Sequence, residues 1–131
     1  MVRTKQNIKL TKFELEIMDE LWKLEMASVG EIRQGLPERK RPAYTTVQTI
    51  VNRLEDKGAV RRVKKVGNAY VYEAVVTKDA AHRRLINELL DLLGGSRPLM
   101  AHLVDEGKVS LEDLRGLEAQ LAAQSKAKKG S

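Results

Sequence analysis

Residues 45–53 of this 131-residue chain carry side chains that can recognise the edges of DNA bases. If the surrounding segment is helical, Val47, Ile50, Val51 and Leu54 fall on one inward stripe, and the polar side chains face away. A carboxamide can pair bidentately with adenine, a guanidinium can pair with guanine, and a threonine methyl group can pack on that of thymine. The alternative is an ordinary solvated helix face. We predict base-reading roles for Thr45, Thr46, Gln48, Thr49, Asn52 and Arg53.

Basic side chains on both sides of this segment favour a polyanionic partner. The net charge is +6 and the pI is near 9.7, and residues 33–65 alone hold ten basic and three acidic residues. Basic groups that neutralise phosphates fix a protein's register on DNA without reading its sequence. From a loop at 38–41 and a hairpin after residue 60, we predict contacts to the DNA backbone by Arg39, Lys40, Arg41, Arg62, Lys64, Lys65 and Asn68.

Two capping boxes predict the helices that precede this segment. Thr11 and Glu14 have the spacing of such a box, and the helix that they open runs to about Leu24. Ser28 and Glu31 form the second box and open a shorter helix. Each pair joins a hydroxyl at the N-cap to a carboxylate three residues later, so both helix starts are predicted from local chemistry.

The third helix has one clear end and one ambiguous end. Gly58 suits the left-handed residue that follows a helix, so the helix ends at Lys57. Its start lies either at Ala43 or at a capping box on Thr45 and Gln48. In both cases the predicted base-reading residues lie on it.

A β-hairpin is predicted after the third helix. Residues 60–66 and 70–75 are rich in β-forming residues and flank the turn pair Gly67-Asn68. Three helices followed by a hairpin is the order of a winged helix-turn-helix, whose third helix enters the major groove. We therefore predict a mainly α fold with a small antiparallel β-hairpin, and a DNA-binding domain over residues 1–76.

The rest of the chain is predicted to be a helical dimerisation region over 77–124, followed by a disordered basic tail over 125–131. Helices in this region would expose more apolar surface than soluble monomers usually show, and a two-fold dimer would bury it. The alternative is that they fold back on the winged domain. The predicted dimer residues are Leu85, Leu89, Leu92, Leu99, Leu103, Leu114, Leu117 and Leu121.

The composition argues against several other classes of protein. There is no cysteine and there are only two histidines, so we expect no metal site and no cofactor. His82 and His102 have no obvious nucleophile or paired acid near them in the sequence, so we expect no enzyme. Neither a membrane-spanning run nor a signal peptide is apparent, which favours a cytoplasmic protein without membrane insertion.

Three stretches of the chain resemble the penicillinase-repressor family, the repressors of β-lactamase and methicillin-resistance genes and their relatives. The stretches are Leu10-Thr11 with Glu14, Ile17-Met18 and Leu21-Trp22, then Ala43 to Val47, then Asn52 to Gly58. The similarity runs from about Leu10 to Leu121 and includes the break at Gly94-Gly95.

The resemblance implies a homodimeric winged-helix repressor on dyad-symmetric operators, often of the TACA/TGTA kind. Positions matching Thr45, Thr46, Gln48 and Arg53 contact DNA in that family, and the helices after the wing dimerise. Some members leave DNA when a membrane metallopeptidase sensor cuts them in the dimer region, at an Asn–Phe bond in the staphylococcal-type proteins. The matching bond here is His102–Leu103. Copper-sensing relatives carry paired cysteines, and this chain has none.

A second class of function stays open at this stage. A winged-helix domain can also act as a protein–protein adaptor without a role on DNA. More acidic residues would be expected on the exposed face of the third helix in an adaptor, and here Glu55 and Asp56 are confined to its last turn.

Overall fold

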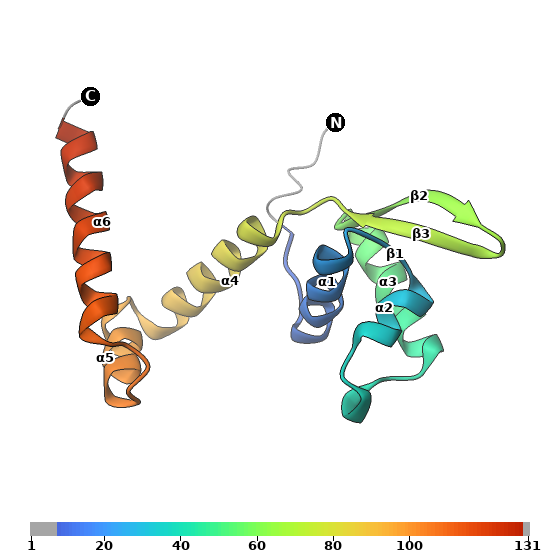
Figure 1. Ribbon diagram of the computed structural model, residues 1–131, viewed down its shortest axis with the longest axis horizontal. Helices are drawn as coiled ribbons and strands as arrows, with labels where there is room; N and C mark the ends of the chain where they lie inside the picture. The colour runs from blue at the N-terminus through green and yellow to red at the C-terminus, as the bar shows by residue number, and fades with distance from the viewer. Residues whose placement is uncertain (1–7, 130–131) are drawn as a thin grey trace. The chain divides into compact units, whose positions relative to one another are not determined.

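The structure is a computed structural model that describes residues 8–129, and these divide into two units, one ending at Asn87 and the other beginning at Glu88 (Figure 1). The boundary falls within α4. The elements in chain order are α1 Lys12–Leu24, β1 Met26–Ser28, α2 Val29–Gly35, the 3₁₀ helix η2 Glu38–Lys40, α3 Tyr44–Lys57, β2 Val60–Val66, β3 Ala69–Ala74, α4 Lys78–Leu93, α5 Arg97–Asp105 and α6 Leu111–Lys129.

Both predicted capping boxes are present. The Glu14 backbone N–H donates to Thr11 Oγ1 at 3.2 Å, and the Thr11 N–H donates to Glu14 Oε1 at 2.9 Å. Ser28 and Glu31 repeat the arrangement at the start of α2. Since each box satisfies amides that a helix start leaves without partners, the two helices begin where their caps fix them.

The start of α3 is decided in favour of Ala43. That residue is the N-cap and provides no side-chain hydrogen bond, so Thr45 and Gln48 do not form a capping box. The helix ends as predicted, because Gly58 adopts a left-handed conformation with φ of 82°. The inward stripe is confirmed, and its buried residues are Val47, Ile50, Val51 and Leu54.

The sheet has one strand more than the sequence predicts. Within the described residues it is antiparallel with the order β1-β3-β2, so the short strand β1 adds to the predicted hairpin. Ala27 of β1 pairs with Tyr72 of β3. A β-bulge interrupts the β2–β3 pairing, because Arg62 pairs with Tyr72 whereas Lys64 pairs with the adjacent Val71. The bulge determines which face of the wing each basic side chain occupies.

The core of the first unit lies between its helices and the sheet (Figure 1). Trp22 packs against this core and is half-buried, and its indole N–H donates to the Val76 carbonyl at 3.0 Å. The His82 ring, from the first half of α4, meets the Trp22 ring edge to face at 6.1 Å. The largest fully buried side chains include Ile17, Met18, Leu21, Ile32, Leu54 and Tyr72.

The helices of the second unit begin and end at the expected signals. Gly94 and Gly95 have φ values of 75° and 132° and separate α4 from α5. Ser110 Oγ accepts from the Asp113 N–H at 3.0 Å and opens α6. The backbone N–H of Ser110 bonds the Asp113 carboxylate in return and lowers its pKa.

One expectation for the end of the chain is corrected. We expected a disordered tail from residue 125, but α6 continues through Lys129. The alanine and lysine residues of this stretch have high helix propensity and extend the preceding helix. Residues 130–131 lie outside the described part of the chain.

Candidate DNA-binding interface

The predicted base-reading side chains lie together along one face of α3. Thr45, Thr46, Thr49, Asn52 and Arg53 are exposed, and Gln48 is half-buried. The helix has no acidic residue in its first turn. The buried stripe holds the opposite face of α3 in the core, so this polar face is the one that a ligand can reach.

Hydrogen bonds along α3 fix several of these groups before any ligand binds. Gln48 Nε2 donates to Asn52 Oδ1 at 3.1 Å, one helical turn away. Thr49 Oγ1 donates to the Thr45 carbonyl at 2.9 Å. In this arrangement the Gln48 carbonyl oxygen and the Asn52 NH₂ group are left for a partner. An acceptor beside a donor matches the edge that adenine presents in the major groove.

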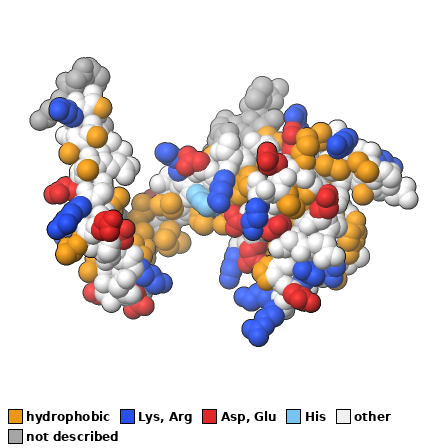
Figure 2. Space-filling model, in the orientation of Figure 1, with side chains coloured by type: hydrophobic (Ala, Val, Ile, Leu, Met, Phe, Trp, Pro, Cys, Tyr) orange, Lys and Arg blue, Asp and Glu red, His pale blue; other side chains and the backbone are white. Residues whose placement is uncertain are grey.

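The loop before α3 uses its basic residues in two ways. The Arg41 guanidinium donates to the carbonyls of Gln34 at 2.9 Å and Leu36 at 3.1 Å, so it holds the end of α2. Both bonds use Nη2 alone, so the expected contact of Arg41 with the DNA backbone stays a prediction. Arg39 and Lys40 are exposed on η2, and Figure 2 shows basic side chains gathered at this end of the first unit.

Two basic side chains of the wing share a face with Tyr70. The Arg62 guanidinium lies 4.1 Å from the centre of the Tyr70 ring, and Lys65 Nζ lies 5.3 Å from it. Arg62 Nε also pairs with Glu55 of α3 at 2.9 Å, so this face of the wing adjoins the helix. Desolvation alone lowers the pKa of Arg62, but the Glu55 carboxylate reverses this and leaves the pKa above its usual value.

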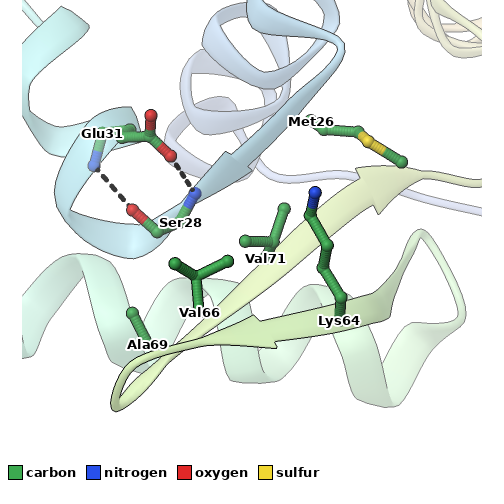
Figure 3. Close-up of a pocket in the computed structure, with 7 residues that line it drawn as sticks. All are labelled: Met26, Ser28, Glu31, Lys64, Val66, Ala69 and Val71. Carbon is green, nitrogen blue, oxygen red and sulfur yellow. Dashed lines mark hydrogen bonds between the residues drawn. The ribbon is translucent and has the colours of Figure 1, made fainter.

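Lys64 lies on the other face of the wing from Arg62 and Lys65, the two residues with which we grouped it as a predicted contact to the DNA backbone. The bulge pairs it with Val71, and its side chain lines a hollow of about 450 Å³ beside the start of α2 (Figure 3). The complete lining is Met26, Ser28, Glu31, Lys64, Val66, Ala69 and Val71. Asn68 is exposed in the turn at the tip of the wing.

Two aromatic residues of this region were missed by sequence reasoning. Tyr44 is the first residue of α3 and is half exposed, and Tyr70 carries the two cations described above. An aromatic residue directly before the Thr45-Thr46 pair is a signal that could have found Tyr44. Nothing in the sequence indicates the position of Tyr70, because a bulge sets it.

The predicted dimer residues form no core of their own. Leu85, Leu89 and Leu92 of α4 are exposed, as are Leu114, Leu117 and Leu121 of α6. Leu99 and Leu103 of α5 are half-buried, and no side chain from residue 82 to 127 is buried. His102 is exposed, and the His102–Leu103 bond lies within α5.

The described part of the chain offers little for other chemistry. Between residues 8 and 129, no three or more His, Cys, Asp and Glu side chains lie together in a way that could hold a metal ion. None of the helices in that range combines the length and the apolar character that crossing a membrane requires.

Three helices, a three-stranded sheet with a basic wing and an exposed polar third helix define a winged helix-turn-helix DNA-binding protein. The chain belongs to the penicillinase repressor family, whose profile matches residues 10–123. The protein is therefore a transcriptional repressor, and DNA is its partner.

Relatives of known sequence or structure agree with this assignment. The chain is 29% identical over 120 residues to the transcriptional regulator BlaI of Mycobacterium tuberculosis, with 88% of this chain and 86% of that protein covered. It is 25% identical over 119 residues to an uncharacterised 16.5 kDa protein of Latilactobacillus sakei, with 89% and 81% covered. The solution structure of the DNA-binding domain of the repressor BlaI matches with a TM-score of 0.50 and 27% identity, covering 56% of this chain and 89% of that one.

Proposed function

We propose that this repressor binds operator DNA of dyad symmetry as a homodimer. The observation that carries the proposal is the pairing of two surfaces, the polar face of α3 in the first unit and the uncovered leucines of the second. Two recognition helices related by a two-fold axis read half-sites about one helical turn, or ~34 Å, apart. A dyad-symmetric operator then matches the symmetry of the protein.

Base reading is assigned to Thr45, Thr46, Gln48, Thr49, Asn52 and Arg53 on α3. Arg53 supplies the guanidinium, a group that suits guanine, and its exposure on the helix leaves it able to reach a base edge. Gln48 and Asn52 act as a pair, because their mutual hydrogen bond orients both amides.

Phosphate contacts are assigned to Arg39 and Lys40 of the loop and to Arg62, Lys65 and Asn68 of the wing. Arg41 supports this set indirectly, because it holds the turn that presents its two basic neighbours. Lys64 takes a smaller share, since the bulge turns it to the other face of the wing.

Dimerisation is assigned to the leucines of α4, α5 and α6. Apolar side chains left exposed over three helices form a larger patch than soluble monomers usually carry, and a second copy would cover it. Figure 2 shows hydrophobic side chains grouped on the helices of the second unit.

The genes that this repressor regulates are proposed to serve β-lactam resistance or a related response, in line with the family. The protein is proposed to act in the cytoplasm. Release by a membrane metallopeptidase sensor at His102–Leu103 would first require local opening of α5, because proteases cut extended segments and this bond is helical.

The experiment that tests this function is an operator titration of Arg53→Ala and Gln48→Ala. Each variant should lose ~1–3 kcal/mol of binding, confined mainly to one operator position, because one base contact is removed. Arg83→Ala is the control, since this exposed arginine of α4 pairs with Asp79 away from α3. Equal losses on operator and random DNA would make the residue a phosphate contact. Unchanged binding in both variants would favour the adaptor function.

A further inference from the structure

One ion pair between a buried carboxylate and a half-buried lysine joins the first helix of the winged unit to the far end of α3. Lys57 Nζ lies 2.5 Å from Glu14 Oε1, and the Glu14 side chain is only 3% exposed. The same oxygen accepts the Thr11 backbone N–H at 2.9 Å, and Lys57 Nζ also donates to the Lys9 carbonyl at 3.0 Å. We call Glu14 and Lys57, with these two backbone partners, the clasp. It unites two of the sequence motifs on which the family resemblance rests.

The Lys57 charge is paired within the clasp, with the Glu14 carboxylate. Burial by itself raises the pKa of the Glu14 carboxyl, but the hydrogen bonds from Lys57 and Thr11 outweigh it and leave the pKa below its usual value. The carboxylate is therefore ionised and is matched by the Lys57 ammonium. Although Lys57 lies in the most basic stretch of the chain, its charge is used inside the protein.

The position of Lys57 gives the clasp leverage over α3. Thr45 lies twelve residues before Lys57, which is about 18 Å along the helix at 1.5 Å per residue. A tilt of about 5° at Lys57 would move Thr45 by about 1.5 Å, more than the ~0.5 Å tolerance of a well-formed site. The buried stripe of α3 is apolar and non-directional, whereas the clasp is directional.

We propose that the clasp is a positioning device that orients α3 for base reading, and that Lys57 makes no phosphate contact. This proposal rests on the proposed function of α3. Two simpler roles for Lys57 can be told apart from positioning by experiment. A phosphate contact would change the salt dependence of binding, and a purely structural ion pair would change only stability.

The test uses the full chain with Lys57→Met, Glu14→Gln and the double variant. Lys23→Met is the matched control, because Lys23 is an exposed lysine of α1 that pairs with Glu20. Binding is titrated over a range of salt on random DNA and on an operator selected by the unmodified protein. Urea unfolding is measured on the same samples.

Lys57→Met should lower the ratio of operator to random affinity by about tenfold, because misplaced side chains lose about one base contact. The salt slope on random DNA should stay unchanged. The double variant should be no worse than Lys57→Met, because two residues of one pair do not contribute additively. A slope that falls by ~0.9 would make Lys57 a phosphate contact and overturn the proposal. Lower stability with an unchanged affinity ratio would also overturn it.

A second measurement, of backbone amide resonances, tests without DNA whether the clasp positions α3. The backbone amide resonances of residues 45–53 should shift in Lys57→Met and stay in place in Lys23→Met. Resonances that do not move would overturn the clasp whether or not the protein reads an operator. An unmodified protein that shows no preference for any operator, with resonances that shift as expected, would refute the proposed function and leave the positioning of α3 supported.

Discussion

The two units of this chain differ in how far their apolar side chains are buried. In the first unit Ile17, Met18 and Leu54 are fully buried, and helices and sheet share one core. In the second unit no side chain from residue 88 to 127 is buried, although the helices are rich in leucine. A segment with its own core can fold alone, whereas exposed leucines on this scale need a partner surface. The comparison separates a part with its own core, which carries the proposed base-reading helix, from a part whose exposed leucines carry the proposed dimerisation.

Removal of the second unit should give the largest effect. A chain ending at Asn87 keeps the core and the Trp22 contacts, so it should remain folded and become a monomer. Affinity for a two-half-site operator should fall by ~10²–10⁴-fold, because the second contact is no longer intramolecular. Sedimentation and operator titration measure both properties. Equal affinity in the short and full chains would show that dimerisation lies elsewhere or has no role.

A core truncation tests whether stability resides in the first unit. Leu54→Ala should cost ~2–5 kcal/mol of unfolding free energy, because the side chain is 0% exposed and leaves a cavity. In the monomer, at protein concentrations below the dimer dissociation constant, Leu92→Ala should change it by less than ~0.5 kcal/mol, because this residue is 85% exposed in the single chain. Hydrogen exchange of the α3 amides follows the first unit specifically. Similar losses in both variants would mean that the two units share one cooperative core.

A charge on α6 should weaken the dimer without unfolding the protomer. Leu117 is 57% exposed, so Leu117→Asp costs the isolated chain little, but it would bury an unpaired carboxylate in the dimer. We expect a loss of ~3 kcal/mol, or about 100-fold in dimer dissociation. Ala119→Asp is the control, because Ala119 lies two residues from Leu117 and therefore on the other side of the same exposed helix. If sedimentation gives the same dimer constant for both variants, the leucines of α6 lie outside the interface.

Substitutions in the wing should have the smallest effect on DNA binding, and they should distinguish its two faces. Lys65→Ala should reduce the salt slope of binding by ~0.9, because Lys65 shares the α3 side of the wing with Arg62. Lys64→Ala should leave the slope nearly unchanged, because Lys64 lines the hollow on the other face. Titrations at several salt concentrations compare the two variants. A reversed result would place the opposite face of the wing against the DNA.

Features set by neighbouring residues could be predicted from the sequence. The capping boxes at Thr11 and Ser28 and the left-handed Gly58 are local, because each depends on a few residues of one turn. The inward stripe of α3 follows from helical spacing alone. These local signals were enough to place the polar face of α3 and to order the elements of a winged helix.

Features set by distant residues could not be predicted. The strand β1 is too short to show periodicity, and it exists because β3 offers an edge to it. The bulge beside Lys64 depends on the β3 register, and Arg41 turns inward because carbonyls at the end of α2 lie within reach. The clasp joins residues 43 positions apart, and neither motif indicates its partner.

The indole of Trp22 gives this protein an internal optical reporter. It is the only tryptophan of the chain, and it lies between the Val76 carbonyl and the His82 ring, where α4 begins. Any event that lifts the start of α4 from α1 would expose this indole to water and shift its fluorescence emission to longer wavelength. The emission of unlabelled protein can therefore follow in real time how binding, cleavage or a ligand changes the packing of the start of α4 against α1.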